Sequence, residues 1–131
     1  MVYELLGLIL RDLPSQKENT AVGRALELIE ERYRTPVSVS DLADEVGLER
    51  TYFSSLFKKT TGVSPHAYVG ELRIRRACEL LRQGEKSISE IAEAVGLDYR
   101  NFARVFKAKT GESPKDYRAH RRYRRKSREE G

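Results

Sequence analysis

One segment of this chain occurs twice at a constant spacing of 49 residues, and this repeat restricts the architectures that the chain can adopt. The first copy spans residues 38–72 and the second spans residues 87–121, and the two align without a gap. The positions that recur most clearly are Gly47 with Gly96, Phe57-Lys58 with Phe106-Lys107, Thr61-Gly62 with Thr110-Gly111, and Ser64-Pro65 with Ser113-Pro114. A repeat at fixed spacing predicts two supersecondary units of the same kind.

The first copy has the pattern of a short helix, a glycine turn and a second helix. We expect Ser40 to cap the first helix, because its hydroxyl oxygen can accept from a backbone N–H of the first turn. Gly47 ends that helix, since glycine adopts a positive φ without a Cβ clash. The second helix runs from Arg50 to Thr60. This order predicts a helix-turn-helix unit.

The second copy repeats this order with its own start and stop residues. Ser87 or Ser89 opens the first helix, and Gly96 ends it. Asp98 or Tyr99 begins the second helix, which ends near Gly111. A second helix-turn-helix unit is therefore expected.

Four further segments are also predicted to be helical, and no segment has a convincing strand period. They are an amphipathic helix from Val2 to Leu13, a helix that Asn19 or Thr20 caps after a polar linker and that ends before Pro36, a joining helix from Pro65 to Arg82, and a terminal helix from Pro114. In the joining helix we expect Tyr68, Leu72, Ala77, Leu80 and Leu81 to be buried, whereas Arg73, Arg75, Arg76 and Arg82 are cationic.

We thus predict an all-α fold with two helix-turn-helix subdomains of the homeodomain-like, three-helix kind, joined by a long linking helix. The expected divisions are residues 1–18 as amphipathic helix and linker, 19–64 as the first subdomain, 65–84 as the linking helix, 85–118 as the second subdomain, and 119–131 as a basic tail.

The charge of the chain is unevenly distributed along the sequence. Residues 1–49 hold five Lys and Arg against ten Asp and Glu, a net charge of −5, whereas residues 50–131 hold twenty against ten, a net charge of +10. Clustered cations favour a polyanionic partner, because binding releases condensed counterions. With one Cys and two His in the chain, we predict no metal, no cofactor and no internal disulfide. The absence of an apolar run of membrane length and of a signal peptide predicts a soluble, cytoplasmic protein without a membrane partner. If the polyanionic partner is DNA, the protein is associated with the nucleoid.

The second helix of each unit sorts its residues onto an apolar inner face and a polar outer face. The inner faces hold Phe53, Leu56 and Phe57 in the first unit, and Phe102, Val105 and Phe106 in the second. A helix of this kind fits the DNA major groove, where Arg donates twice to guanine and Ser or Thr contacts several bases. We predict base contacts from the outward side chains of Thr51, Ser54, Ser55, Tyr99, Arg100, Ala103 and Arg104, and phosphate contacts from Arg50, Lys58, Lys59 and Lys107.

The two outer faces differ, and each has a simpler alternative interpretation. Arg100 and Arg104 predict sharper base preference in the second half-site than in the first. A solvated surface is the alternative for either face, and the duplication favours DNA over it. For Tyr52 and Tyr99, packing and groove contact are equally open. We interpret the run of cations from Arg118 to Arg128 as a solvated tail that holds phosphates loosely.

These residues resemble the DNA-binding domain of the AraC/XylS family of bacterial transcription regulators. The resemblance covers residues 25–118. It rests on SISEIAEAVGL followed by NFARVFKAKTGESPKDYR, on DLADEVGL with YFSSLFKKTTGVSPHAY, and on the joining LRIRRACELL. It implies a sequence-specific transcription regulator or activator that binds double-stranded DNA, with the recognition helices of one chain in successive major grooves.

The resemblance also implies partners besides DNA. RNA polymerase is expected as a contact, and a homodimer is expected through an amino-terminal effector-binding or dimerisation domain that this chain lacks. We expect residues 1–18 to be the tail of such a domain. Alternatively, their apolar stripe packs on the DNA-binding unit of a naturally short regulator.

Two other classes of function are weighed against DNA binding. An enzyme is disfavoured because no Ser/His/acid or Cys/His arrangement is evident around His66 or His120. A helical protein-interaction module without DNA binding is the second alternative, with the first helix as its surface. Salt-sensitive binding to duplex DNA distinguishes the two.

Overall fold

The computed structural model describes residues 15–121, and every element in that range is a helix. The helices are α2 (Gln16–Arg32), α3 (Val39–Glu45), α4 (Arg50–Thr61), α5 (Pro65–Gln83), α6 (Ile88–Ala94) and α7 (Tyr99–Thr110), followed by a helix over residues 114–121. The predicted all-α class is confirmed for this part of the chain. The helix expected from Val2 to Leu13 and the tail beyond residue 121 lie outside the described residues. No helix in the described range is both long and apolar enough to cross a membrane.

The described chain divides into two compact units. The first holds the residues up to Arg32 and Val37–Tyr68, and the second holds Tyr33–Pro36 and the residues from Val69 onward. Helix α5 begins in the first unit and continues in the second. Residues 33–36, which lie between α2 and α3, therefore belong to a different unit from these two helices.

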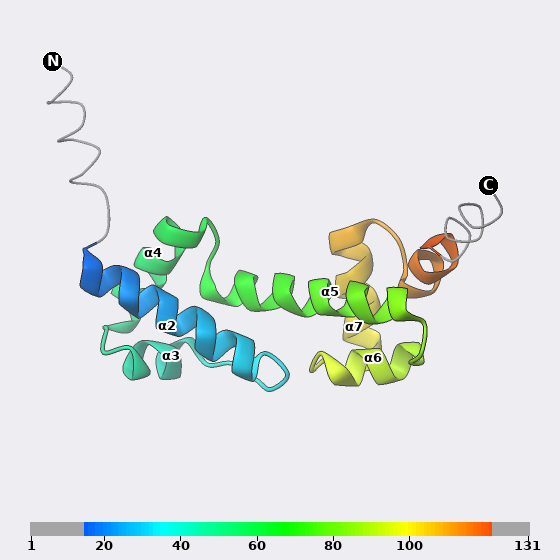
Figure 1. Cartoon of the computed structure of the whole chain (residues 1–131), viewed down its shortest axis with the longest axis horizontal. Coiled ribbons are helices and arrows are strands. Elements are labelled where there is room, and N and C mark those ends of the chain that lie inside the picture. The colour runs from blue at the N-terminus through cyan, green and yellow to red at the C-terminus, as the bar shows by residue number, and fades with distance from the viewer. Residues whose placement is uncertain (1–14, 122–131) are drawn as a thin grey trace, which may run out of the picture. The chain divides into compact units, whose positions relative to one another are not determined.

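In the first unit, α2 packs against α3 and α4 (Figure 1). The core is apolar on all three helices, with Val22, Ala25, Leu28 and Ile29 from α2, Leu42 and Ala43 from α3, and Phe53, Leu56 and Phe57 from α4. An ion pair of 3.0 Å between Arg32 and Glu45 joins the surfaces of α2 and α3. The predicted inner face of α4 is confirmed.

Two helix starts in this unit differ from the prediction. Helix α2 begins at Gln16, where the Ser15 hydroxyl accepts the backbone N–H of Glu18 at 3.2 Å, so the expected cap at Asn19 or Thr20 is wrong. The polar residues after Ser15 include no proline or glycine, so nothing in them interrupts a solvated first turn. Helix α3 is capped by Ser38, whose hydroxyl accepts from the Asp41 N–H at 3.2 Å, and not by Ser40.

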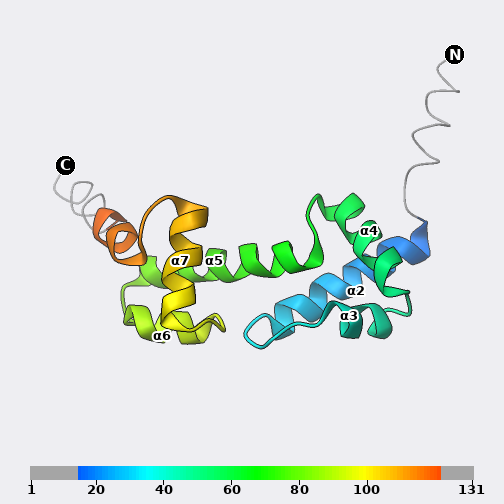
Figure 2. The same ribbon diagram turned by 180° about the vertical axis from the view of Figure 1, so that it is seen from behind.

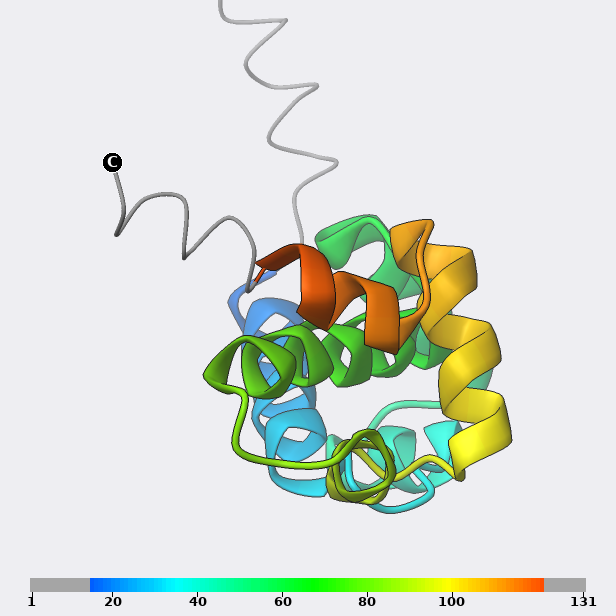
Figure 3. The same ribbon diagram turned by 90° about the vertical axis from the view of Figure 1, so that its right-hand side faces the viewer.

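In the second unit, α6 and α7 pack together, and a tight turn leads from α7 into the helix of residues 114–121 (Figures 2 and 3). Phe102 and Phe106 of α7 are fully buried, and Ile91 and Val95 lie in the same unit with no exposed surface. Val105 is half-buried, so its predicted place on the inner face is only partly correct. The Ser87 hydroxyl caps α6 by accepting the N–H of Glu90 at 3.1 Å. Of the two predicted starts, Ser87 and Ser89, the first is therefore correct.

Helix α5 buries part of the set of residues that we expected to be buried, and one of its arginines binds backbone carbonyls. Leu72, Ala77 and Leu81 are buried, whereas Tyr68 and Leu80 are half-buried. Arg73, one of the four cationic residues, has a structural role. Its Nε donates to the Tyr33 carbonyl at 2.8 Å and its Nη2 donates to the Thr35 carbonyl at 2.9 Å, and burial lowers the pKa of its guanidinium.

The repeat extends to individual ring contacts. Phe57 meets Tyr68 edge-on at 5.6 Å between ring centroids and an angle of 82°, and Phe106 meets Tyr117 at 5.4 Å and 82°. Edge-to-face pairs of this kind stabilise by about 0.5–1.5 kcal/mol beyond the burial of their area. Tyr68 and Tyr117 are themselves 49 residues apart. The two units therefore share a scaffold of side chains as well as a helix order.

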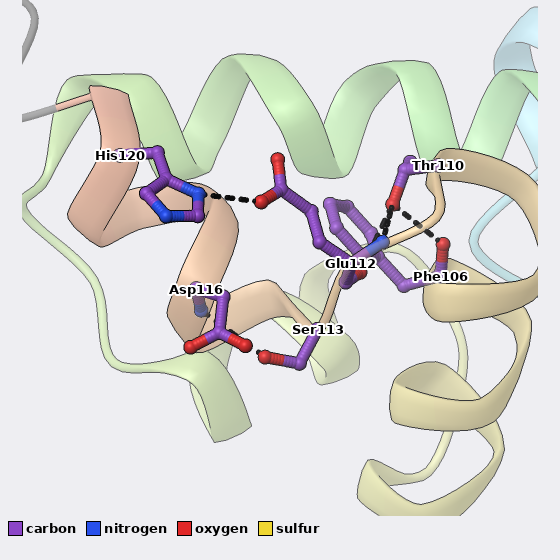
Figure 4. A network of polar contacts seen from close by, with 6 residues as sticks. All are labelled: Phe106, Thr110, Glu112, Ser113, Asp116 and His120. Atoms are coloured by element: carbon purple, nitrogen blue, oxygen red, sulfur yellow. Dashed lines mark hydrogen bonds and ion pairs between the residues drawn. The ribbon is translucent and has the colours of Figure 1, made fainter.

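The turn after α7 is held by a short polar network (Figure 4). The Thr110 hydroxyl lies 2.8 Å from the Phe106 carbonyl and 3.0 Å from the Glu112 carbonyl. The Ser113 hydroxyl accepts the N–H of Asp116 at 3.1 Å, which confirms a helix start at residue 114. A hydrogen bond of 2.6 Å between Glu112 Oε2 and His120 Nδ1 joins the turn to that helix.

The carboxyl-terminal cations begin inside the fold. Arg118 is half-buried, and its Nη2 donates to the carbonyl oxygen of Lys86, ahead of α6. The interpretation of Arg118 as the start of a solvated tail is therefore wrong. Its long side chain packs its stem against the unit and satisfies a backbone carbonyl with its head.

Candidate nucleic-acid interface

The two glycine turns place α4 and α7 in the same way relative to the helix that precedes each. Gly47 has a φ of +74° and Gly96 a φ of +82°, both in the left-handed region that favours glycine. In the first turn the N–H of Leu48 bonds to the carbonyl of Ala43 at 2.9 Å, and in the second the N–H of Leu97 bonds to that of Ala92 at 2.9 Å. These bonds close the preceding helix and set the direction of the next. Both predicted turns are confirmed.

Each candidate recognition helix begins at an acidic cap. In α4 the two carboxylate oxygens of Glu49 accept the N–H groups of Thr51 and Tyr52, each at 2.9 Å, and these bonds hold the pKa of Glu49 below its usual value. In α7 the cap is Asp98, which accepts the N–H of Asn101 at 2.8 Å. Asp98 is therefore the cap and Tyr99 the first helical residue of α7.

The outer face of α4 is cationic and holds no acidic residue within the helix. Thr51 and Ser55 are exposed and Ser54 is half-buried, so two of the three predicted base contacts in this unit are exposed to solvent. The predicted phosphate contacts Arg50, Lys58 and Lys59 are all exposed.

The outer face of α7 carries more charge. Arg100, Arg104 and Lys107 are exposed, Ala103 is half-buried, and Tyr99 is 57% exposed. Helix α7 also has no acidic residue within its bounds, whereas α6 before it carries Glu90 and Glu93. The seven base contacts and four phosphate contacts remain predictions. In the structure those of the first unit all lie on α4, and those of the second unit all lie on α7.

Tyr52 is 48% exposed and is held from a neighbouring helix. Its hydroxyl donates to the Glu18 carboxylate of α2 at 2.8 Å. This bond is the main reason why the pKa of Glu18 is lowered and that of Tyr52 is raised. Glu18 was not singled out in the sequence, because it lies 34 residues from its partner.

Asn101 is a second residue that the sequence prediction did not include. Its side-chain amide donates to Asp98 at 2.7 Å, and its amide oxygen accepts from Arg104 Nη2 at 3.4 Å. All three residues lie at successive spacings of three along α7, so the signal that identifies them is an Asp, Asn and Arg at i, i+3 and i+6.

No cluster of metal-ligating side chains accompanies these helices. Within residues 15–121, no three His, Cys, Asp or Glu residues lie close enough together to hold a metal ion. Cys78 is a half-buried free thiol. The chemistry that the described surface offers is therefore hydrogen bonding and cationic charge from two exposed helix faces.

Two helix-turn-helix units with acid-free, cationic second helices define a class of protein before any relative is considered. A family model described as a helix-turn-helix domain matches residues 42–120. The chain belongs to the AraC-type helix-turn-helix family. The family predicted from the sequence is thereby confirmed.

One curated relative is the Msm operon regulatory protein of Streptococcus mutans, which is 30% identical over 93 residues. That match covers 66% of this chain and 34% of the relative. The chain therefore spans about a third of the length of this relative.

Solved structures agree with the fold over most of the chain. A transcriptional regulator with an AraC-type DNA-binding domain from Chromobacterium violaceum has a TM-score of 0.72 and 34% identity, over 79% of this chain and 93% of that one. The DNA-binding domain of AdpA, a global transcriptional factor in complex with a target DNA, has a TM-score of 0.75 and 27% identity, over 79% of this chain and 95% of that one.

Proposed function

We propose that the chain is a sequence-specific DNA-binding transcription regulator, with α4 and α7 as its two recognition helices in successive major grooves of double-stranded DNA. The observation that carries the proposal is the pairing of two exposed, cationic helix faces without acidic residues, each of which follows a glycine turn with the same hydrogen bond. The AdpA domain, whose fold this chain shares, is in complex with DNA. We propose no catalytic role.

The side chains divide into two roles under this proposal. Thr51, Ser54 and Ser55 of α4 read bases in one groove, and Tyr99, Arg100, Ala103 and Arg104 of α7 read bases in the other. Arg50, Lys58, Lys59 and Lys107 neutralise phosphates, which positions the helices without reading sequence.

The proposal for the whole protein extends beyond DNA. The chain spans about a third of the length of the Msm operon regulatory protein, so effector control and dimerisation of the whole protein remain part of the proposal. We propose RNA polymerase as a further partner of such a regulator. Co-purification of polymerase subunits with the DNA-bound protein, compared with the free protein, tests this contact.

The test of DNA binding starts from random duplexes, because no operator is assumed. Selection followed by fluorescence anisotropy should show affinity that falls with salt, at a slope of about −0.9 per phosphate neutralised. Lys58→Ala should weaken all sequences similarly and reduce the salt slope by about 1, whereas Arg104→Ala should lose discrimination at one base pair. Lys17→Ala, which removes an exposed lysine from α2, is the matched control and should leave the salt slope unchanged.

Two results would overturn the proposal in different ways. Absence of salt-sensitive binding to any duplex would favour a helical protein-interaction module. Unchanged affinity and sequence preference for Arg104→Ala would show that α7 is not a recognition helix, even where the chain binds DNA.

A further inference from the structure

The exposed face of α7 carries a chain of three hydrogen-bonded side chains that begins at the helix cap. Asp98 accepts twice from Asn101, once from its backbone N–H at 2.8 Å and once from its side-chain amide at 2.7 Å. Arg104 then donates from Nη2 to the Asn101 amide oxygen at 3.4 Å. Three residues at a spacing of three therefore link the helix cap to the guanidinium of Arg104.

The chemistry of the three groups permits only one direction for this chain. A carboxylate accepts hydrogen bonds and donates none, so the nitrogen of the Asn101 amide faces Asp98. The amide oxygen is left on the opposite side, where only a donor can meet it. Arg104 is a donor with no acceptor capacity, so the order acid, amide, guanidinium satisfies every polar atom that takes part.

This arrangement restrains Arg104 without consuming it. Only Nη2 takes part in the bond to Asn101, and the side chain is exposed. A guanidinium has five N–H donors, so a pair remains for the O6 and N7 atoms of a guanine. A long side chain that is already oriented loses less conformational entropy on binding.

The first unit has no equivalent chain among its described residues. The positions that correspond to Asp98, Asn101 and Arg104 are Glu49, Tyr52 and Ser55. Glu49 directs both oxygens to backbone N–H groups, and the Tyr52 hydroxyl bonds to Glu18 of α2. The chain of side-chain bonds is therefore a property of α7 and not of the shared scaffold.

We propose that Asn101, oriented by Asp98, is a positioning residue that preorganises the Arg104 guanidinium for base readout. The proposal rests on the proposed function of α7 as a recognition helix. It makes Asn101 a determinant of specificity that acts through Arg104 and not through a base contact of its own.

The test is a double-mutant cycle on base discrimination at the position that Arg104 reads. Asn101→Ala keeps the backbone N–H that Asp98 caps, so the start of α7 is preserved. It should lower discrimination about two- to tenfold, the range expected when one long side chain must be ordered on binding. In the Arg104→Ala background the same substitution should change nothing, because the residue through which it acts is gone.

A second variant tests the first link of the chain. Asp98→Asn retains a good helix cap but presents an amide that competes for the orientation of Asn101. It should lower discrimination in the same direction as Asn101→Ala, and thermal melting by circular dichroism should show both variants folded. Lys107 lies on the same helix but takes no part in these hydrogen bonds. Lys107→Ala should lower affinity and leave base discrimination unchanged.

The outcomes separate this proposal from the proposed function. Loss of discrimination by Asn101→Ala that persists in the Arg104→Ala background would show a direct base contact and overturn the positioning role. Salt-sensitive binding with full discrimination in folded Asn101→Ala protein would overturn it while leaving DNA binding intact. A wild-type chain that binds no duplex would overturn both.

Discussion

At the scale of single residues, the hydrogen bond between Tyr52 and Glu18 ties α4, a proposed recognition helix, to α2. The bond is 2.8 Å long and joins α4 to α2 across 34 residues of sequence. The Tyr52 hydroxyl, followed by the Ser15 hydroxyl, lowers the pKa of Glu18. The ionised carboxylate is therefore the form that the folded unit favours.

This lowered pKa predicts a pH dependence with a definite sign. A carboxyl group whose pKa is lower in the folded state stabilises the fold above its ordinary pKa, and this stabilisation is lost as pH falls through the folded value. The ordinary value for Glu18 is 4.5. Tyr52→Phe should therefore lower the melting temperature at pH 6 to 7, and the difference from wild type should narrow as the pH falls below about 4.5.

The matched control for this prediction is Tyr99→Phe on α7. Tyr99 is 57% exposed, and no hydrogen bond of its hydroxyl is found within residues 15–121. Removal of the Tyr99 hydroxyl should leave the pH dependence of the melting temperature unchanged. A Tyr52→Phe profile parallel to wild type from pH 3 to 7 would show that the bond to Glu18 contributes nothing to stability.

At the scale of elements, the two glycine turns have the same backbone geometry and different surroundings. An added Cβ on Gly47 would meet nothing within 4 Å, whereas one on Gly96 would lie 2.5 Å from the Arg34 carbonyl oxygen. The segment Tyr33–Pro36 approaches Gly96 within the second unit, and Arg73 holds that segment through two of its carbonyls. Gly96 is therefore required both by its positive φ and by the nearby backbone of Arg34, whereas Gly47 is required by its positive φ alone.

This difference predicts unequal costs for the same substitution. Gly47→Ala should destabilise by about 1–2 kcal/mol, because alanine is strained in the left-handed region. Gly96→Ala should cost clearly more, since its Cβ also collides with backbone that cannot rotate away. Urea unfolding at matched conditions measures both, and equal values would show that the segment 33–36 yields without cost.

At the scale of the whole chain, two copies of one scaffold carry unlike outer faces. The shared parts are the glycine turns, the Phe pairs and the Tyr68 and Tyr117 edges. The faces differ because α4 presents hydroxyls at Thr51, Ser54 and Ser55 where α7 presents Arg100, Ala103 and Arg104. Helix α5, which is 19 residues long, belongs to both units.

This asymmetry predicts an unequal binding site. Major-groove centres on one face of DNA are about 34 Å or 10 base pairs apart, so selected sites should hold two half-sites at that spacing. The half-site that loses discrimination in Arg104→Ala protein should carry more sequence information, because bidentate Arg contacts discriminate better than single hydroxyls. Equal or reversed information in the two half-sites would contradict the assignment.

The sequence by itself determined the features that depend on neighbours along the chain. The repeat, the helix order, the glycine turns and the buried Phe pairs follow from periodicity and local backbone preference, which operate within a few residues. The hydrogen bonds that link Asp98, Asn101 and Arg104 also depend on near neighbours in the sequence, and they could have been identified from the spacing of these residues. The caps of α2 and α3 were mistaken because neighbouring hydroxyl or amide side chains offered more than one start.

Only the tertiary structure decided which distant side chains and backbone groups meet. Tyr52 with Glu18, Arg73 with the Tyr33 carbonyl, and Arg118 with the Lys86 carbonyl are separated by 34, 40 and 32 residues. Periodicity places each of these side chains on a face, but it carries no information on what that face will contact. Packing therefore gives two cations, Arg73 and Arg118, structural roles, and it leaves the outer face of α7 exposed.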